Sequence, residues 1–300
     1  MDSMYEIKKY TEVLDFPAGA QSAFLRLEKN FGENAEAKQS FDQLISKFMT
    51  EKTAFSEIEE PLKPMAEQFA VSIYTVDMVF LLACLPNLSE KYRKANLPES
   101  LFRETMMDLK YKLLECKTVH DVWGIFVAGW YPEFYHLERF ALGRFQYECA
   151  GFDCDHYEKD GFLLKRGDNV INFHIPSSGA MTKDIRMDSY RKAYQFYEKE
   201  RINGVLPMVC DSWLLFPEHN NMLPDSSNIR SFMSDFTILR QSEEYNFSNG
   251  WRVYGKENLE PICDLPENSS LERGYKKLLL AGKKSGGGYG LILFDGEKIL

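Results

Sequence analysis

The sequence predicts an α+β protein in which a helical N-terminal domain precedes a domain built around a mixed sheet. Its 300 residues are enough for about two domains. In the first part of the chain, apolar residues recur at spacings of three and four, which is typical of helices. After about residue 143, short β-branched and aromatic runs alternate with turn residues, which is typical of strands. This change predicts one domain over residues 1–140 and another over residues 141–300.

Three helices and a connector are predicted in the first domain. Residues Ala35–Met49 place apolar side chains on one helical face. Residues Glu57–Pro64 are charged and contain two prolines, which predicts a connector between helices. An apolar helix over residues 68–84 is expected to end at Leu85–Asn87, where a proline interrupts it. A further helix is predicted over Glu99–Glu115, directly after another proline.

The second domain is predicted to contain several short strands and one long helix between two of them. The turn residues Arg166–Asn169 predict a hairpin between the strands on either side. The three consecutive glycines Gly286–Gly288 predict a flexible loop before the last strand. The predicted strands are Phe145–Phe152, Phe162–Lys165, Val170–Ile175, Met208–Phe216, Thr237–Gln241, Trp251–Tyr254 and Gly290–Phe294, and the predicted helices are Asp184–Glu200, Asn228–Phe236 and Ser270–Ala281.

The charge and hydropathy of the chain disfavour nucleic-acid and membrane partners. The formal net charge is −9, and both predicted domains contain more acidic than basic residues. Such a chain does not attract polyanions over its whole surface. Residues Gln68–Ser89 carry only one charge, at Asp77, and approach the roughly 20 residues that span a bilayer. Because this stretch also contains several polar residues and Pro86, we interpret it as a buried core helix rather than a membrane span.

The six cysteines indicate free thiols in a reducing compartment. They are irregularly spaced and include no CxxC pair, and the N-terminus has no basic segment followed by an apolar one. This pattern predicts a cytoplasmic protein. A zinc site could be imagined at Cys149, Cys154 and His156, but their spacing matches no common zinc framework. We therefore expect no metal.

Common nucleotide and hydrolase motifs are absent. The sequence contains neither the GxxxxGK[ST] phosphate loop nor the GxSxG elbow of α/β-hydrolases. No GxGxxG follows a predicted strand. These absences disfavour the corresponding classes of enzyme.

One loop, Pro176–Thr182, has the features of an anion site. It runs from the end of a predicted strand into the start of a predicted helix, where backbone N–H groups and the helix dipole favour negative charge. Ser177, Ser178 and Thr182 add hydroxyl donors, and Gly179 allows a ligand to approach the backbone. The alternative interpretation is an ordinary helix-capping loop, since such loops are often rich in serine and glycine.

The order of several short motifs resembles a little-studied bacterial acyltransferase-like family. Its members join a helical N-acyltransferase N-terminal domain to a GNAT-like C-terminal domain, and the resemblance covers roughly residues 60–295. The motifs that carry it are Leu85-Pro86, Tyr92, Leu97-Pro98, Thr105 and Asp108, the junction Leu142–Glu148, His174-Ile175-Pro176 with Gly179 and Thr182, Ser189 and Ala193, Ser212–Leu215 with Pro217, and Ser227-Asn228-Ile229 with Phe232 and Phe236.

The resemblance implies an N-acyltransferase that uses acetyl-CoA or another acyl-CoA as cosubstrate. It implies that the strands Val170–Ile175 and Met208–Phe216 splay apart and admit the pantetheine arm. The acyl acceptor would be an amine that the sequence does not identify, and a backbone N–H of the first strand would stabilise the oxyanion. The residues implied in binding the CoA pyrophosphate are Ile175, Ser177, Ser178, Gly179, Ala180, Met181 and Thr182.

The candidate catalytic residues are His174, Ser212 and Glu148. His174 ends the first of the two strands, Ser212 lies on the second, and Glu148 lies on an earlier strand; each also has a structural interpretation. A nucleophilic Cys210 beside His174 is disfavoured, because direct transfer in GNAT-like folds needs no covalent intermediate.

Two features favour a different class of function. The usual pyrophosphate signature, Gln/Arg-x-x-Gly-x-Gly/Ala, is missing, and the segment Ser226–Phe236 contains no tyrosine to protonate the leaving thiolate. The alternative is therefore a non-catalytic module on a GNAT-like fold that binds acyl-CoA or a protein.

Overall fold

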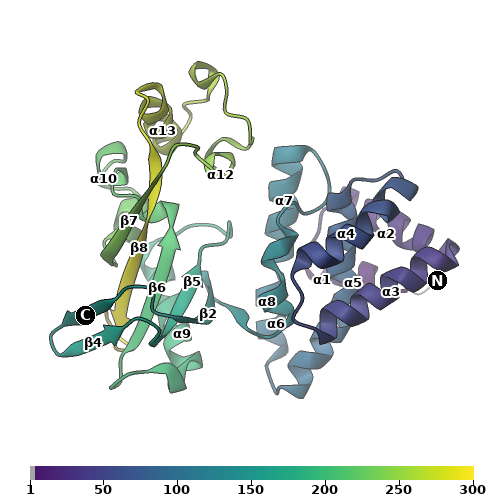
Figure 1. Cartoon of the computed structure of the whole chain (residues 1–300), viewed down its shortest axis with the longest axis horizontal. Helices are drawn as coiled ribbons and strands as arrows, with labels where there is room; N and C mark the ends of the chain where they lie inside the picture. The colour runs from purple at the N-terminus through teal and green to yellow at the C-terminus, as the bar shows by residue number, and fades with distance from the viewer. Residues whose placement is uncertain (1–3) are drawn as a thin grey trace. The chain divides into compact units, whose positions relative to one another are not determined.

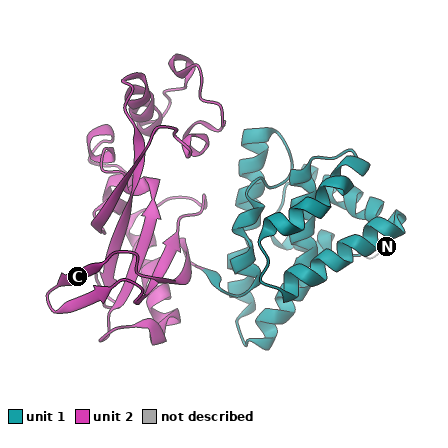
Figure 2. Ribbon diagram, in the orientation of Figure 1, with its two compact units in different colours: residues 1–140 teal, residues 141–300 magenta. Residues whose placement is uncertain are grey.

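The computed structural model describes residues 4–300 and divides the chain into two compact units, residues 1–140 and 141–300 (Figure 2). The first unit is helical, and the second is built around a mixed sheet (Figure 1). The predicted α+β class is therefore confirmed.

The first unit is a set of helices around one central helix, α5 (Ile73–Lys94). Every residue from Thr75 to Leu85 is buried, and α5 packs against α1, α2, α3, α4 and α6. A helix that is buried on all sides belongs to a core. The other helices are α1 (Ile7–Val13), α2 (Ala18–Glu33), α3 (Ala35–Thr50), α4 (Phe55–Gln68), α6 (Glu99–Met106), α7 (Asp108–His120), α8 (Pro132–Tyr135) and the 3₁₀ turn η1 (Ala128–Trp130).

By length and composition, α5 is the one helix within residues 4–300 that could cross a membrane. Most of its apolar stretch is nevertheless buried inside the structure. The core helix of a globular domain meets the same criteria, and the packing around α5 is of that kind.

The sequence predicts helix breaks at prolines in two places of this unit, and both predictions are wrong. The predicted connector Glu57–Pro64 lies inside α4, and α5 continues through Pro86 to Lys94. A proline removes one helical hydrogen bond, but burial of the apolar face of each helix outweighs that loss. The predicted single helix Glu99–Glu115 is in fact two helices that are separated at Met107.

The second unit is built on a six-stranded sheet in the order β1-β2-β5-β6-β8-β7, whose first strand begins at the last residues of the first unit. The strands β5 and β6 are parallel and are joined through the helix α9 (Lys183–Phe196), whereas β2–β5, β6–β8 and β7–β8 are antiparallel. The strands are β1 (Arg139–Leu142), β2 (Phe145–Gly151), β5 (Asn169–His174), β6 (Leu206–Ser212), β7 (Thr237–Glu244) and β8 (Ser285–Phe294).

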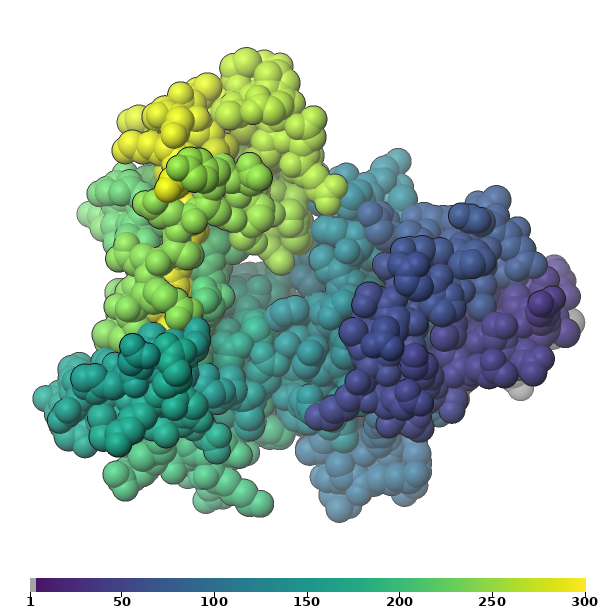
Figure 3. Space-filling view, viewed as in Figure 1, coloured from purple at the N-terminus to yellow at the C-terminus, as the bar shows by residue number. Residues whose placement is uncertain are grey.

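The predicted hairpin around Arg166–Asn169 is wrong. The strand β4 (Phe162–Lys165) pairs with β3 (His156–Lys159), while β5 lies between β2 and β6. Val170 and Ile171 are both buried, as expected of a central strand, whereas β4 buries only Leu164. The hairpin β3–β4 forms part of the surface of the second unit (Figure 3).

The two faces of the sheet are covered differently. On one face, α9 and α11 (Asn228–Met233) pack with aromatic rings of the strands: Phe145 stacks on Tyr190 of α9, and Phe173 contacts Phe232 of α11 and stacks on Phe236, which follows α11. On the opposite face, residues of the hairpin β3–β4 pack on an apolar cluster centred on Val170, Val209, Leu291 and Leu293. We call these the helical face and the hairpin face.

Short helices complete the second unit. The predicted strand Trp251–Tyr254 is the helix α12 (Gly250–Tyr254), so that prediction is wrong. The predicted strand Met208–Phe216 ends at Ser212 and continues as a 3₁₀ turn. The remaining elements are η2 (Glu198–Glu200), η3 (Trp213–Leu215), α10 (His219–Met222), η4 (Ile262–Asp264) and α13 (Ser270–Leu280).

The predicted flexible loop Gly286–Gly288 lies within β8, whose ten residues are all buried. A Cβ atom at Gly287 would lie 3.0 Å from the carbonyl oxygen of Ser212, and one at Gly288 would lie 2.8 Å from that of Leu215. The glycines are therefore needed because the η3 turn lies directly on this strand.

Candidate active site

The parallel strands β5 and β6 separate before either of them ends. Their register contains only two pairs, Ile171 with Met208 and Asn172 with Val209. Beyond this point β5 stays paired with β2 as far as His174, and β6 stays paired with β8 as far as Ser212. The strand ends therefore diverge, and the backbone groups on their facing edges do not pair with each other.

The loop Pro176–Thr182 leaves β5 at this opening and leads into α9 (Figure 1). Ser177, Gly179, Ala180 and Thr182 are exposed, whereas Met181 is buried. Thr182 is the N-cap of α9, and its side chain makes no capping hydrogen bond. The first N–H groups of the helix therefore lack a side-chain cap, which is the condition for anion binding at a helix start.

Two buried arginines hold this loop through its carbonyl groups. Arg144 donates to the carbonyl oxygens of Pro176 (2.7 Å), Gly179 (3.1 Å) and Ala180 (3.1 Å), and to Ser178 Oγ (3.0 Å). Sequence reasoning missed Arg144 as a site residue, although it lies in the family motif Leu142–Glu148.

The second arginine, Arg186, lies on α9. Its Nη1 donates to the carbonyl oxygen of Met181 at 2.6 Å. Its Nε and Nη2 bind the two carboxylate oxygens of Asp235 at 2.7 and 3.1 Å, and Nη2 also donates to the carbonyl of Ser231. Because Arg186 is fully buried and Asp235 nearly so, this charge pair is shielded from water and joins the loop to α9 and α11.

Two of the predicted catalytic residues lie together on the hairpin face. Glu148 is paired with Asn172 across β2 and β5, and His174 is two residues further along β5. The Nε2 atom of His174 lies 2.6 Å from Glu148 Oε1, and Asn172 Nδ2 donates to the same oxygen at 3.0 Å. Both acidic and imidazole side chains are largely buried.

The short contact joins the imidazole ring of His174 to the carboxylate of Glu148. The 2.6 Å contact between His174 Nε2 and Glu148 Oε1 is a hydrogen bond, and Asn172 Nδ2 lies 3.1 Å from the same ring nitrogen. Which ring nitrogen carries the proton depends on the tautomer of the imidazole. Sequence reasoning missed Asn172, although its position two residues before His174 places it on the same face of the strand.

The third predicted catalytic residue, Ser212, lies on the other face of the sheet. Side chains alternate along a strand, so Asp211 shares the hairpin face with Val209, whereas Cys210 and Ser212 share the helical face. Ser212 Oγ accepts a hydrogen bond from the N–H of Leu214 and caps the η3 turn. The structure thus does not bring Ser212 to His174 and Glu148.

Cys210 is not placed to act with His174 either. The two side chains lie on opposite faces of the sheet. Burial raises the pKa of the Cys210 thiol, which keeps it protonated. This geometry agrees with a transfer that uses no cysteine nucleophile.

A neutral histidine–tyrosine pair lies close to the end of β6. His219 Nε2 is 2.9 Å from the hydroxyl of Tyr275, and both side chains contact the ring of Trp213. Burial lowers the pKa of His219 to about 4 and raises the pKa of Tyr275. The pair, which sequence reasoning missed, connects α13 to the segment after η3.

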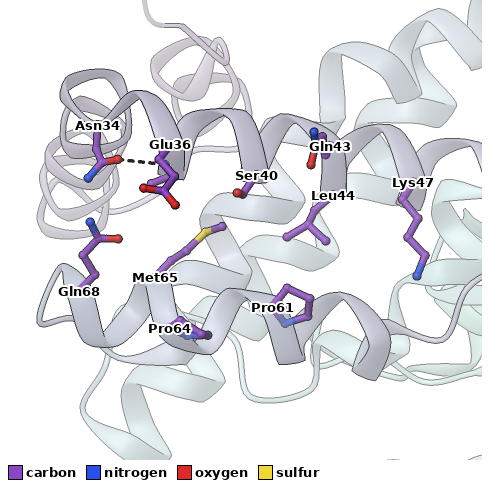
Figure 4. A pocket seen from close by; sticks show the side chains of 11 residues that line it. Asn34, Glu36, Ser40, Gln43, Leu44, Lys47, Pro61, Pro64, Met65 and Gln68 are labelled. Atoms are coloured by element: carbon purple, nitrogen blue, oxygen red, sulfur yellow. Dashed lines mark hydrogen bonds between the residues drawn. The ribbon is translucent and has the colours of Figure 1, made fainter.

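A separate groove lies in the first unit between α3 and α4 (Figure 4). Its volume is about 650 Å³, and it contains none of the predicted site residues. The lining residues are Asn34, Glu36, Ala37, Ser40, Gln43, Leu44, Lys47, Pro61, Pro64, Met65 and Gln68.

Within residues 4–300, no group of three or more His, Cys, Asp or Glu side chains is arranged to hold a metal ion.

Three solved structures of acyltransferases share the fold over almost the whole chain. An acyltransferase in complex with decanoyl-CoA is 21% identical, with a TM-score of 0.72 over 96% of this chain and 88% of its own. A mutant acyltransferase with octanoyl-CoA, and an acyltransferase with decanoyl-CoA and teicoplanin, are each 16% identical, with a TM-score of 0.71 and the same coverage. No curated protein sequence matches the chain.

Two family models together match nearly the entire chain. Residues 6–137 match the N-acyltransferase N-terminal domain, and residues 140–292 match the GNAT-like C-terminal domain. The family that the sequence motifs suggested is thereby confirmed. The chain belongs to the family of proteins that join an N-acyltransferase N-terminal domain to a GNAT-like C-terminal domain.

Proposed function

We propose that this protein transfers an acyl group from acyl-CoA to an amine. The observation that carries the proposal is the separation of β5 from β6 beyond Asn172 and Val209, directly before the loop that enters α9. This is the arrangement in which GNAT-like proteins hold the pantetheine arm. The similar solved structures contain decanoyl-CoA, octanoyl-CoA or CoA.

The donor would lie along the opening and the loop. The pantetheine arm would pair with the edge of β5 that β6 leaves. The pyrophosphate would accept hydrogen bonds from the segment Ile175–Thr182, at the uncapped start of α9. Gly179 has a φ of +111° and no atom within 4 Å of a Cβ position, so nothing in the structure obstructs the backbone there.

The chemistry follows from the pair on the hairpin face. The amine nitrogen would attack the thioester carbonyl, the C–N bond would form, and the C–S bond would break to release CoA as a thiolate. In the tautomer that carries its proton on Nε2, toward Glu148, His174 Nδ1 would take the proton from the amine, and Glu148 would stabilise the resulting imidazolium. A backbone N–H on the edge of β5 that faces the opening would stabilise the oxyanion.

The experiment separates binding from transfer. Calorimetry with CoA, octanoyl-CoA and decanoyl-CoA should show binding, and release of free thiol from the acyl-CoAs should accelerate when amines are added as a panel. Binding without any amine-dependent thiol release would support the alternative, a non-catalytic acyl-CoA module. Absence of binding by all three would overturn the proposal.

A further inference from the structure

The loop Pro176–Thr182 directs its carbonyl groups toward the interior of the second unit. Arg144 binds the carbonyls of Pro176, Gly179 and Ala180, and Arg186 binds that of Met181. Four of the seven carbonyls are therefore held by two guanidinium groups. Arg144 is nearly buried and Arg186 is fully buried, so water competes little for these bonds.

Because the peptide bond is planar, the direction of each carbonyl also fixes the direction of the N–H group of the next residue. In a trans peptide, the N–H of each residue points opposite to the carbonyl of the residue before it. The carbonyls of Gly179 and Ala180 point at Arg144 and that of Met181 points at Arg186, so the N–H groups of Ala180 and Met181 point away from Arg144 and that of Thr182 points away from Arg186. Successive N–H groups that are turned away from these guanidinium groups are the donors that a bound anion can use.

The two arginines bind different sets of partners. The charge of Arg186 is balanced by the bidentate contact with Asp235, and Arg186 also joins α9 to α11. Arg144, in the turn that precedes β2, donates four hydrogen bonds to the loop, at Pro176, Ser178, Gly179 and Ala180. Among the described residues, Arg144 therefore binds four positions of the loop, whereas Arg186 binds one, the carbonyl of Met181.

We infer that Arg144 is a positioning residue that fixes this loop in the conformation that binds the diphosphate of CoA. The inference rests on the proposed function. It also accounts for the missing glycine-rich signature: the loop contains one glycine, and the guanidinium of Arg144 holds the carbonyls away from the ligand. Lysine cannot replace it, because an ammonium lacks the planar set of five donors.

The test compares CoA with a donor that lacks the diphosphate. Octanoyl-CoA and octanoyl-pantetheine share the acyl chain and the pantetheine arm, but only octanoyl-CoA reaches the loop. In Arg144→Gln and Arg144→Lys, affinity for octanoyl-CoA should fall about 10- to 100-fold, while affinity for octanoyl-pantetheine stays within about twofold. A purely structural role would weaken both ligands equally, and that result would overturn the inference.

A matched control is Arg201→Gln. Arg201 also donates to a backbone carbonyl, that of Tyr194, but at the other end of α9. The ratio of the two affinities should remain at the wild-type value in this variant.

If the Arg144 variants do not fold, hydrogen exchange of the loop amides in the wild-type protein tests the same inference. Octanoyl-CoA should slow exchange of the amides of Ala180, Met181 and Thr182, whereas octanoyl-pantetheine should not. Equal protection by both ligands would overturn the inference. If the wild-type protein binds neither ligand, the proposed function itself fails, and the two failures are thus distinguished.

Discussion

The pairing of Glu148 with His174 depends on the register between two strands rather than on spacing in the sequence. The residues are 26 positions apart and meet because Gln146 lies opposite His174 in the β2–β5 ladder. Both were candidates from the sequence, since each is a titratable residue on a predicted strand. Which strands are neighbours is a property of the whole sheet, so their contact could not be predicted from the sequence.

Replacing His174 by glutamine should lower kcat by about 10²- to 10⁴-fold, the usual contribution of a general base. Glutamine fills a similar volume but cannot take a proton from the amine. The measurement is amine-dependent thiol release from decanoyl-CoA, together with the melting temperature, which should change little. His156→Gln, on the exposed strand β3, is the control. Unchanged turnover in folded His174→Gln would exclude His174 as the base.

Burial of the Asp77 carboxyl group lowers the stability of the first unit. Its side chain is almost completely buried in α5, and within the described residues its Oδ1 atom has no hydrogen-bond partner. Burial, with a contribution from the nearby carboxylate of Glu59, raises the pKa of Asp77 to about 8. The folded protein therefore holds this carboxyl protonated at pH values where the unfolded chain has it ionised.

The expected consequence is a loss of stability as pH rises. The unfolded pKa is about 3.9, so between about pH 4 and pH 8 the folded state binds the extra proton and each pH unit lowers stability by up to about 1.4 kcal/mol. Asp77→Asn should remove this dependence and be more stable than wild type at pH 8 by a few kcal/mol. Urea unfolding at several pH values measures it. Asp121→Asn, at an exposed carboxylate, should keep the wild-type slope; parallel slopes for Asp77→Asn and wild type would contradict the argument.

At the scale of elements, the path of the chain beyond the end of β6, beside the opening, depends on the glycines of β8. The chain can leave the sheet after Ser212 because η3 folds onto Gly287 and Gly288, where side chains would collide with backbone atoms. A glycine-rich segment after a helix was predicted to be a flexible loop. The prediction of a flexible loop assumed that the glycines are there for their conformational freedom. In this strand they are required because the neighbouring backbone leaves no room for a side chain.

Gly288→Ala should therefore disturb the opening. Its Cβ would lie 2.8 Å from the carbonyl oxygen of Leu215, which is backbone and cannot rotate away. We expect a loss of about 1–3 kcal/mol in the free energy of unfolding, as for overpacked cores, and weaker binding of decanoyl-CoA. Calorimetry and denaturant unfolding measure the two effects. Gly32→Ala, in the helix α2 with no atom within 4 Å of the new Cβ, should be at least as stable as wild type; similar behaviour of the two variants would refute the packing argument.

Local patterns predicted most elements, and long-range packing decided the exceptions. The loop Pro176–Thr182 and the helix after it were predicted because strand, loop and helix are contiguous in the sequence. Arg144 was missed because its partner carbonyls lie 32 to 36 residues away. The prolines of α4 and α5 were read as breaks, since the burial that outweighs them comes from other helices.

At the scale of the whole molecule, a chain with a net charge of −9 is proposed to bind a polyanionic ligand. An anionic protein can bind an anionic ligand here because the proposed site uses backbone N–H groups and a helix start. These groups act over a few ångströms and do not depend on the net charge of the chain. All of its residues lie within residues 141–300. Ligand binding should therefore stabilise the second unit directly.

Gly179→Glu tests this reading in the intact protein. CoA at a hundredfold excess over its Kd should stabilise the wild-type fold by about 2.7 kcal/mol, seen by calorimetry as an upward shift of the transition that reports the second unit. Glutamate at position 179 places a negative charge where the diphosphate would lie, and it should abolish the shift. Gly161→Glu is the matched control, because Gly161 also has a positive φ and no atom within 4 Å of its Cβ position, but lies in the turn between β3 and β4. Both variants place a glutamate at a positive φ and add the same charge, so the comparison isolates the effect of position. Loss of the shift in both, or in neither, would mean that the diphosphate does not lie against the loop that enters α9.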